Sequence, residues 1–298
     1  MGVTNHLRVL EPAPGILAFY DGRIAGQRFA PGPNWVDDGA LSLGIASYAV
    51  VEGDAALVYD THVSVQHGEA IRAELAARGV RKFTVLLSHW HLDHVAGTAA
   101  FADCPVIANR RTRAHLTRLK AEIEAGTLLG APGISPLILP DRVFSGSMDL
   151  TIGGRSVTLI EANIHSDDAT VLWLPDVALL LAGDTVEDCV TFVAEPAGLD
   201  THLTDLDRLA SLNPARIMPN HGHPDIIANG GYGPNLIPAT QRYIRHLMRL
   251  RTVPEVAEVS MAEAIAGDIA TGAIKYFAPY EQVHARNLST VAAFYSGI

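Results

Sequence analysis

The sequence predicts an α/β sandwich with mixed sheets. Three observations indicate it: short β-rich runs separated by turn residues, an apolar run that follows a helical segment, and a mostly helical remainder after residue 218. Because hairpins interrupt the alternation of strands with helices, the pattern disfavours a purely parallel, doubly wound sheet.

The first elements form a hairpin, a helix and a buried strand. Gly44–Glu52 and Ala55–Tyr59 are β-rich runs, and Gly53-Asp54 between them is a typical hairpin turn. Helical spacing over Val65–Arg78 predicts a helix. The run Phe83–Leu87 has one polar residue, as is typical of a strand buried on both faces.

The rest of the chain continues the mixed pattern. In order, we expect a strand over 106–108, a helix over 113–125, hairpins over 150–161 and 170–182, a helix over 203–212, a strand over 216–218 and a core-covering helix over 280–295. The segment 126–147 is rich in Gly, Pro and Leu without a clear period, and 222–238 is rich in turn residues. We expect both to be loops.

The composition limits the partners and the compartment. Apolar residues make up 48% and charged residues 18%, so the chain can build a core. Asp plus Glu number 32 and Lys plus Arg 22, a net charge of −10, which disfavours nucleic acid and anionic membranes as partners. The first twenty residues lack an uninterrupted apolar core, and no run approaches the roughly 18 residues of a membrane span. We expect a cytoplasmic protein that acts on a small molecule, and a homodimer is left open.

The most informative segment is Ser88-His89-Trp90-His91-Leu92-Asp93-His94. It offers four potential metal ligands within six positions directly after the buried strand: His89, His91, Asp93 and His94. A loop can turn all four toward one point, whereas a helix would scatter them. Neutral imidazole and carboxylate are ligands that suit zinc, iron or manganese. A solvated polar loop would explain one or two histidines, but not four ligands in this order.

This segment resembles the His-x-His-x-Asp-His motif of the metallo-β-lactamase superfamily. Further residues match the family pattern in chain order near strand ends: His165, Asp184 and His221, with His223 as a competitor for the last. Asp60 resembles the family's buried aspartate, which supports the metal loop by hydrogen bonds.

The resemblance spans roughly residues 45–225 and implies a four-layer αββα sandwich. We therefore expect a single domain over 1–298, in which 226–298 form a helical C-terminal extension. The implied ligands are His89, His91 and His165 for one metal, Asp93, His94 and His221 for the other, and Asp184 as the bridge. The implied cofactors are two divalent ions, Zn²⁺ first and Fe or Mn as alternatives. Such a pair supplies hydroxide from water at neutral pH, and Asp93 is the expected catalytic residue that orients it.

The expected reaction is hydrolysis of a small carboxylic ester, lactone or thioester. Dedicated metallo-β-lactamases typically lack the bridging aspartate, so Asp184 favours the glyoxalase II and lactonase-type members. The chain departs from both, because Glu187 stands where quorum-signal lactonases place Tyr and Val186-Glu187-Asp188 does not match the glycine-rich stretch of glyoxalase II. A β-lactam hydrolase and a mono-iron oxygenase of the persulfide dioxygenase type are the alternatives.

The substrate pocket is expected between loops near the metal-bearing strand ends. Trp35 and Tyr232 lie on such loops, and partly buried loop packing is the alternative for both. His62 stands where relatives usually carry Gly, and either lines the pocket or lies on the surface.

Overall fold

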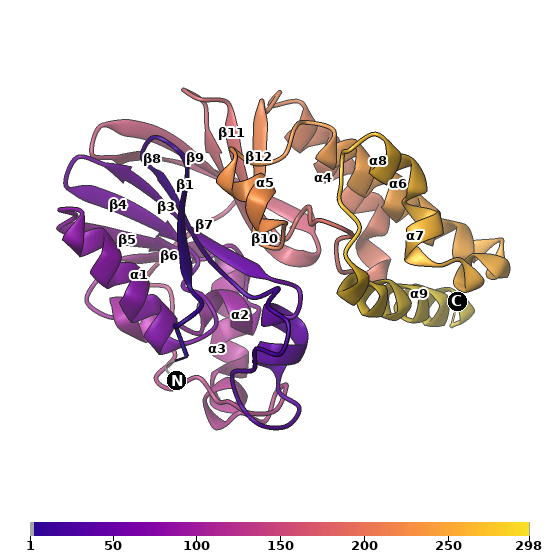
Figure 1. Ribbon diagram of the computed structural model, residues 1–298, viewed down its shortest axis with the longest axis horizontal. Coiled ribbons are helices and arrows are strands. Elements are labelled where there is room, and N and C mark those ends of the chain that lie inside the picture. The colour runs from indigo at the N-terminus through magenta and orange to yellow at the C-terminus, as the bar shows by residue number, and fades with distance from the viewer. Residues whose placement is uncertain (1–2, 298) are drawn as a thin grey trace.

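The computed structural model describes residues 3–297, which form two β-sheets packed face to face with helices on both outer sides (Figure 1). One core cluster joins residues of both sheets, such as Tyr48 and Leu57 of the first and Leu159 and Val171 of the second. This arrangement confirms the predicted four-layer sandwich.

The first sheet has seven strands in chain order: β1 (Arg8–Ala13), β2 (Ile16–Asp21), β3 (Ile45–Glu52), β4 (Ala55–Tyr59), β5 (Lys82–Leu86), β6 (Val106–Asn109) and β7 (Arg142–Phe144). Strands β1 to β4 pair antiparallel, and β4 to β7 pair parallel. The sheet is therefore mixed, as the sequence predicts.

The second sheet has five strands: β8 (Ser147–Ile152), β9 (Arg155–Ile164), β10 (Ser166–Leu174), β11 (Leu179–Gly183) and β12 (Arg216–Pro219). Strands β8 to β11 pair antiparallel, and β12 pairs parallel with β11. Since β11 and β12 are parallel, the residues that follow them leave the sheet at the same edge.

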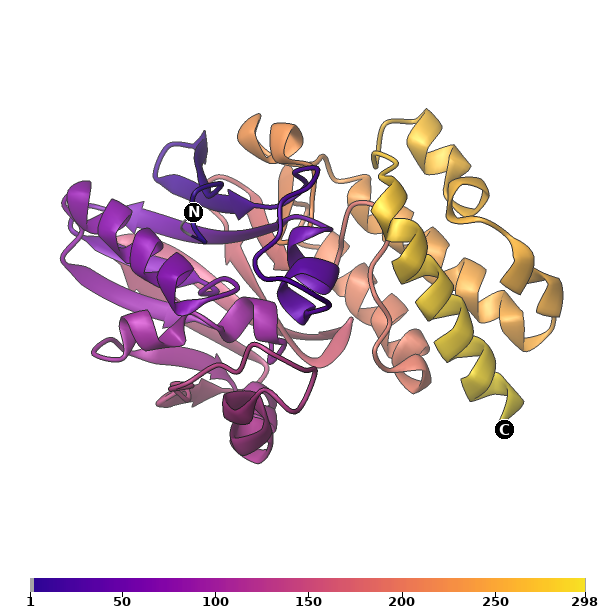
Figure 2. The ribbon, with the colours of Figure 1, turned by 60° about the horizontal axis from the view of Figure 1, so that its bottom comes forward.

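Helices cover the outer faces of both sheets. Those on the first sheet are α1 (Val65–Ala77), α2 (Leu92–Val95) and α3 (Arg110–Ala125). Those in the second half of the chain are α4 (Leu199–Ala210), α5 (Pro224–Ala228), α6 (Leu236–Met248), α7 (Met261–Ala264), α8 (Ala266–Ala270) and α9 (Glu281–Ser296). Figure 2 shows α9 running beside the other C-terminal helices at the far end of the molecule from α1. Among residues 3–297, no helix combines the length and the apolar character needed to cross a bilayer.

Local capping explains where α1 and α3 begin and where α3 ends. The Oγ atom of Ser64 accepts a hydrogen bond from the backbone N–H of His67 at the start of α1. The side chain of Asn109 caps α3 in the same way, by accepting from the N–H groups of Arg111 and Thr112. Helix α3 ends at Ala125 and is followed by Gly126, whose φ of 68° lies in the left-handed region that favours glycine.

Three stretches differ from the sequence-based expectation. The sequence-based expectation lacks strands β1 and β2, because charged residues and prolines interrupt the apolar positions of residues 1–20. The expected loop 126–147 ends in β7, and the expected loop 222–238 contains α5. Strand β7 gains its hydrogen bonds from β6, and both β7 and α5 are too short to show a period of their own.

Candidate metal centre

Loops from both sheets bring the predicted ligands to one place. Residues 89–94 follow β5 and extend into α2, and His165 lies between β9 and β10. Asp184 directly follows β11, and His221 follows β12 by two residues. Segments that are far apart in the sequence therefore contribute to a single cluster.

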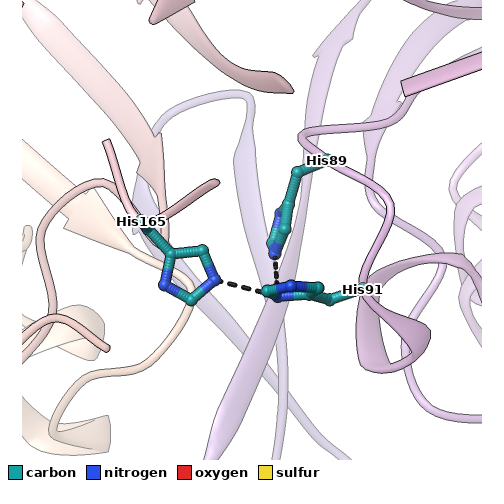
Figure 3. A group of neighbouring side chains, drawn as sticks. All are labelled: His89, His91 and His165. Atoms are coloured by element: carbon teal, nitrogen blue, oxygen red, sulfur yellow. Dashed lines mark hydrogen bonds between the residues drawn. The ribbon is translucent and has the colours of Figure 1, made fainter. Parts of the chain in front are cut away.

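Three imidazoles converge on one point (Figure 3). The Nδ1 atom of His91 lies 2.9 Å from Nε2 of His89 and 2.9 Å from Nε2 of His165. His89 and His165 are buried, and His91 is half-buried. The Nδ1 atom of His89 donates to Ser88 Oγ and that of His165 to Phe192 O, so both Nε2 atoms are free to bind a cation.

A second group forms beside the first. The Nε2 atom of His221 lies 3.2 Å from Asp93 Oδ2, and Nε2 of His94 lies 3.6 Å from Asp93 Oδ1. The Nδ1 atom of His221 donates to Gly44 O at 2.8 Å, which again leaves Nε2 directed at the cluster.

Asp184 lies between the two groups. Its Oδ2 atom is 3.1 Å from His94 Nε2 and 3.5 Å from His221 Nε2. The same oxygen is 3.7 Å from Nε2 of both His89 and His165. One carboxylate oxygen thus faces imidazoles of both groups, as a bridging ligand must.

Asp60 ties the surrounding loops together. Its Oδ1 atom accepts from the backbone N–H of Ser88, and its Oδ2 atom accepts from Ser88 Oγ, His94 Nδ1 and Asn220 Nδ2 at 2.6–2.9 Å. Because these partners come from the β5 loop and from the residues after β12, Asp60 orients His94 and joins the two sheets.

Backbone strain gathers at the same place. Asp60, His62 and His165 have φ angles of 65°, 69° and 70°, in the left-handed region that favours glycine. They are three of the six non-glycine residues with positive φ among residues 3–297. Such conformations persist where surrounding contacts enforce them, and they are typical of functional sites.

The histidines of the two groups differ in the direction of their pKa shifts. Burial lowers the pKa of His89 and His165 and lowers that of His91 to about 3, so all three are neutral ligands near pH 7. Burial also lowers the pKa of His221, but Asp184 and Asp93 outweigh it and raise the value to about 9.

The donor set fits divalent transition metals. The imidazole nitrogens and carboxylate oxygens form two groups, and within each group the ligand atoms lie within 4.8 Å of one another. The first group is His89, His91 and His165, and the second is Asp93, His94 and His221. The buried Oδ1 atom of Asp184 has no hydrogen-bond partner, so this carboxylate has an acceptor to spare. The buried carboxylate of Asp184 and the half-buried one of Asp93 need positive charge nearby, which metal ions would provide.

The residues predicted for the substrate pocket are placed differently. Trp35 is half-buried, and its Nε1 atom donates to Pro132 O at 2.9 Å, which joins its loop to the 126–147 segment. His62 is fully buried and stacks on His67, with 4.5 Å between ring centroids, so the surface alternative is wrong.

Tyr232 is also withdrawn from solvent, with 3% of its surface exposed. Its Oη atom donates to Asp188 Oδ2 and accepts from the backbone N–H of His223. Since these contacts occupy its polar group, Tyr232 holds loops together rather than facing a substrate.

His223, the alternative to His221, makes other contacts: its Nδ1 atom accepts from Asp225 N, and its Nε2 atom contacts Lys275 Nζ.

Sequence reasoning missed two side chains beside the centre. Glu187 lies with His165 and Asp184 in a third group of potential ligands. The ring of Phe192 packs against that of His165, with 5.8 Å between centroids. The sequence singled out Glu187 only as a departure from lactonases, and Phe192 carried no signal in the sequence.

Comparison with known proteins agrees with this geometry. The sequence profile of the metallo-beta-lactamase superfamily matches residues 42–221, more than half of the chain and all seven predicted ligands. The chain belongs to the metallo-β-lactamase superfamily. A metallo-beta-lactamase from Pontibacter korlensis has the same fold, with a TM-score of 0.61, 17% identity, and coverage of 80% of this chain and 99% of that one.

Curated relatives of this superfamily member are distant. The "Beta-lactamase-like protein 2 homolog" of Caenorhabditis elegans is 26% identical over 60% of this chain and 56% of its own length. The "Hydroxyacylglutathione hydrolase" of Rhodobacter capsulatus is 27% identical over 76% of this chain and 80% of its own. The chain spans about half the length of the first curated relatives that it matches.

Proposed function

We propose that this protein is a dinuclear metal-dependent hydrolase of a small carboxylic ester, lactone or thioester. The observation that carries the proposal is the position of Asp184, whose Oδ2 atom lies within 3.7 Å of imidazole nitrogens from both groups. A site for one ion would need only one of the two groups. We propose Zn²⁺ as the ion, with Fe and Mn as alternatives.

The chain's own residues would hold the metal ions and orient the attacking water molecule. Two bound divalent ions would supply hydroxide from water at neutral pH and polarise a carbonyl oxygen. Asp93 is the more exposed of the two carboxylates that face the imidazoles, at 17% against 4% for Asp184. Burial opposes its ionisation, but His94 and His221 hold its pKa below the usual value. As an ionised carboxylate near the solvent side, it can accept a hydrogen bond from a water molecule and so orient it.

The substrate class follows from charge and from the relatives. A net charge of −10 disfavours a polyanion, and we propose a small molecule in place of nucleic acid. The Rhodobacter capsulatus relative is named for hydrolysis of an acyl compound, hydroxyacylglutathione, which supports attack at an acyl carbon.

Metal analysis and a substrate panel test the proposal together. We expect about two equivalents of transition metal per chain and hydrolysis of an ester, a lactone or a thioester that stops on chelation. A chromogenic cephalosporin belongs in the panel, since the fold alone is shared with metallo-β-lactamases. Less than about one equivalent of metal and no hydrolysis would overturn the proposal. One equivalent of iron with oxygen uptake would point instead to the oxygenase alternative.

A further inference from the structure

The loop between Asp184 and Pro196 forms one wall of the centre. It begins at a predicted ligand and carries Phe192, whose backbone oxygen accepts from Nδ1 of His165 at 3.1 Å. Residues 186–191 are at most 4% exposed, yet the loop belongs to no strand or helix. Contacts with other segments must therefore hold it in place.

Most of these contacts come from the C-terminal region, outside the residues that the family profile matches. The backbone N–H of Lys275 donates to Asp188 Oδ1 at 2.8 Å. Asn287 of α9 accepts from Val193 N at 2.8 Å and donates to Thr191 O at 3.0 Å. Together these hydrogen bonds clamp the loop at Asp188 and at residues 191–193, directly after Glu187.

Glu187 connects this clamp to the centre. Its Oε2 atom accepts from Tyr280 Oη at 2.9 Å, and its Oε1 atom accepts from Phe192 N at 3.0 Å. The Oε1 atom also lies 3.6 Å from Nδ1 of His165. The side chains of Glu187 and His165 are 2% and 4% exposed, so water does not compete for these contacts.

Both the position and the chemistry of Glu187 point to a role beyond filling space. A buried carboxyl group costs free energy unless its oxygens are hydrogen-bonded, whereas an apolar side chain would fill the same volume without that cost. Its two oxygens join Tyr280, the wall at Phe192 and the ring of His165. His165 needs such support, because its left-handed backbone conformation is strained.

We propose that Tyr280 and Glu187 act as positioning residues for the metal centre, by holding the imidazole of His165 and the loop that bears Phe192. The inference rests on the proposed function, since it assigns these residues to the site of the same two metal ions. Through Tyr280, the C-terminal region then contributes to the geometry of the site. No bond is formed or broken by either residue.

The test is metal binding by full-length protein that has been stripped of metal and titrated with Zn²⁺ or Co²⁺. Tyr280→Phe removes only the hydroxyl that Glu187 accepts from. We expect it to weaken one of the two binding steps by about 10- to 100-fold, as loss of a ligand's hydrogen-bonded partner typically does. The absorption spectrum of the Co²⁺ form should change, and kcat should fall more than KM rises.

Glu187→Gln is the second variant, and it keeps the size of the side chain in case Tyr280→Phe does not fold. We expect the same weakened step and the same spectral change. Tyr276→Phe is the matched control: Tyr276 is exposed and donates to Glu281 Oε1 at 3.1 Å, so its variant should bind metal as the wild type does.

The outcomes separate this inference from the proposed function. Folded Tyr280→Phe and Glu187→Gln proteins with wild-type metal affinities and Co²⁺ spectra would overturn the inference alone. If Tyr280→Phe does not fold, Glu187→Gln decides by the same criterion. A wild-type protein that binds no transition metal would overturn the proposed function and this inference with it.

Discussion

The two histidine groups of the centre differ in the charge that surrounds them. Around His91 burial dominates, and the pKa values of His89, His91 and His165 are all lowered. Around His221 the carboxylates dominate over burial, and its pKa is raised to about 9. Imidazoles with similar burial are therefore neutral or protonated according to the carboxylates near them.

Removing the metal tests both groups at once and should have the largest effect. A strong chelator is expected to reduce hydrolysis to background, because neither group offers a Ser or Cys nucleophile. Adding Zn²⁺ or Mn²⁺ should restore the rate, measured on the best substrate of the panel. Activity that persists in protein shown to be free of metal would contradict the prediction.

Asp184→Asn tests the residue that both groups share. The substitution removes the negative charge and leaves the shape, so we expect kcat/KM to fall by about 10³-fold, as for loss of a strong transition-state contact. Metal content should fall below that of the wild type. Asp176→Asn, on an exposed turn away from the centre, is the control and should match the wild type.

Asp60→Asn tests the second group alone, since Asp60 contacts His94 and no histidine of the first group. An amide cannot accept from Ser88, His94 and Asn220 as the carboxylate does, so we expect metal affinity to drop by about 10- to 100-fold. Titration with Zn²⁺ should show the loss in one binding step. Equal weakening of both steps would contradict the assignment of Asp60 to the second group.

Proton release on metal binding should give the smallest but most discriminating signal. Below pH 9, His221 is protonated and must lose its proton to bind a cation, so affinity at its group should rise with pH up to about 9. His91, with a pKa of about 3, is already neutral at pH 7, and its group should release none. Calorimetry in buffers of different ionisation enthalpy counts the protons, and equal release from both steps would show that the groups do not differ.

The contrast between the halves of the chain shows how far sequence reasoning reached. Four ligands stand together in residues 89–94, so their pattern is visible locally. His165, Asp184 and His221 stand alone and became recognisable only through their order along the chain. For Tyr232 the sequence leaves pocket lining and loop packing open, and for His62 it leaves pocket lining and the surface open. The structure buries both side chains, through a hydrogen bond to Asp188 for Tyr232 and stacking on His67 for His62.

The mixed α/β sandwich, the hairpins and the identity of the potential ligands can be predicted from the amino-acid sequence. Turn residues, apolar periods and ligand types are local properties of the chain. In contrast, it takes the folded chain to show that one oxygen of Asp184 faces both groups and that Tyr280 reaches Glu187, 93 positions away. Such contacts depend on how the two sheets and the C-terminal helices pack, and the local pattern at either residue does not encode their distance.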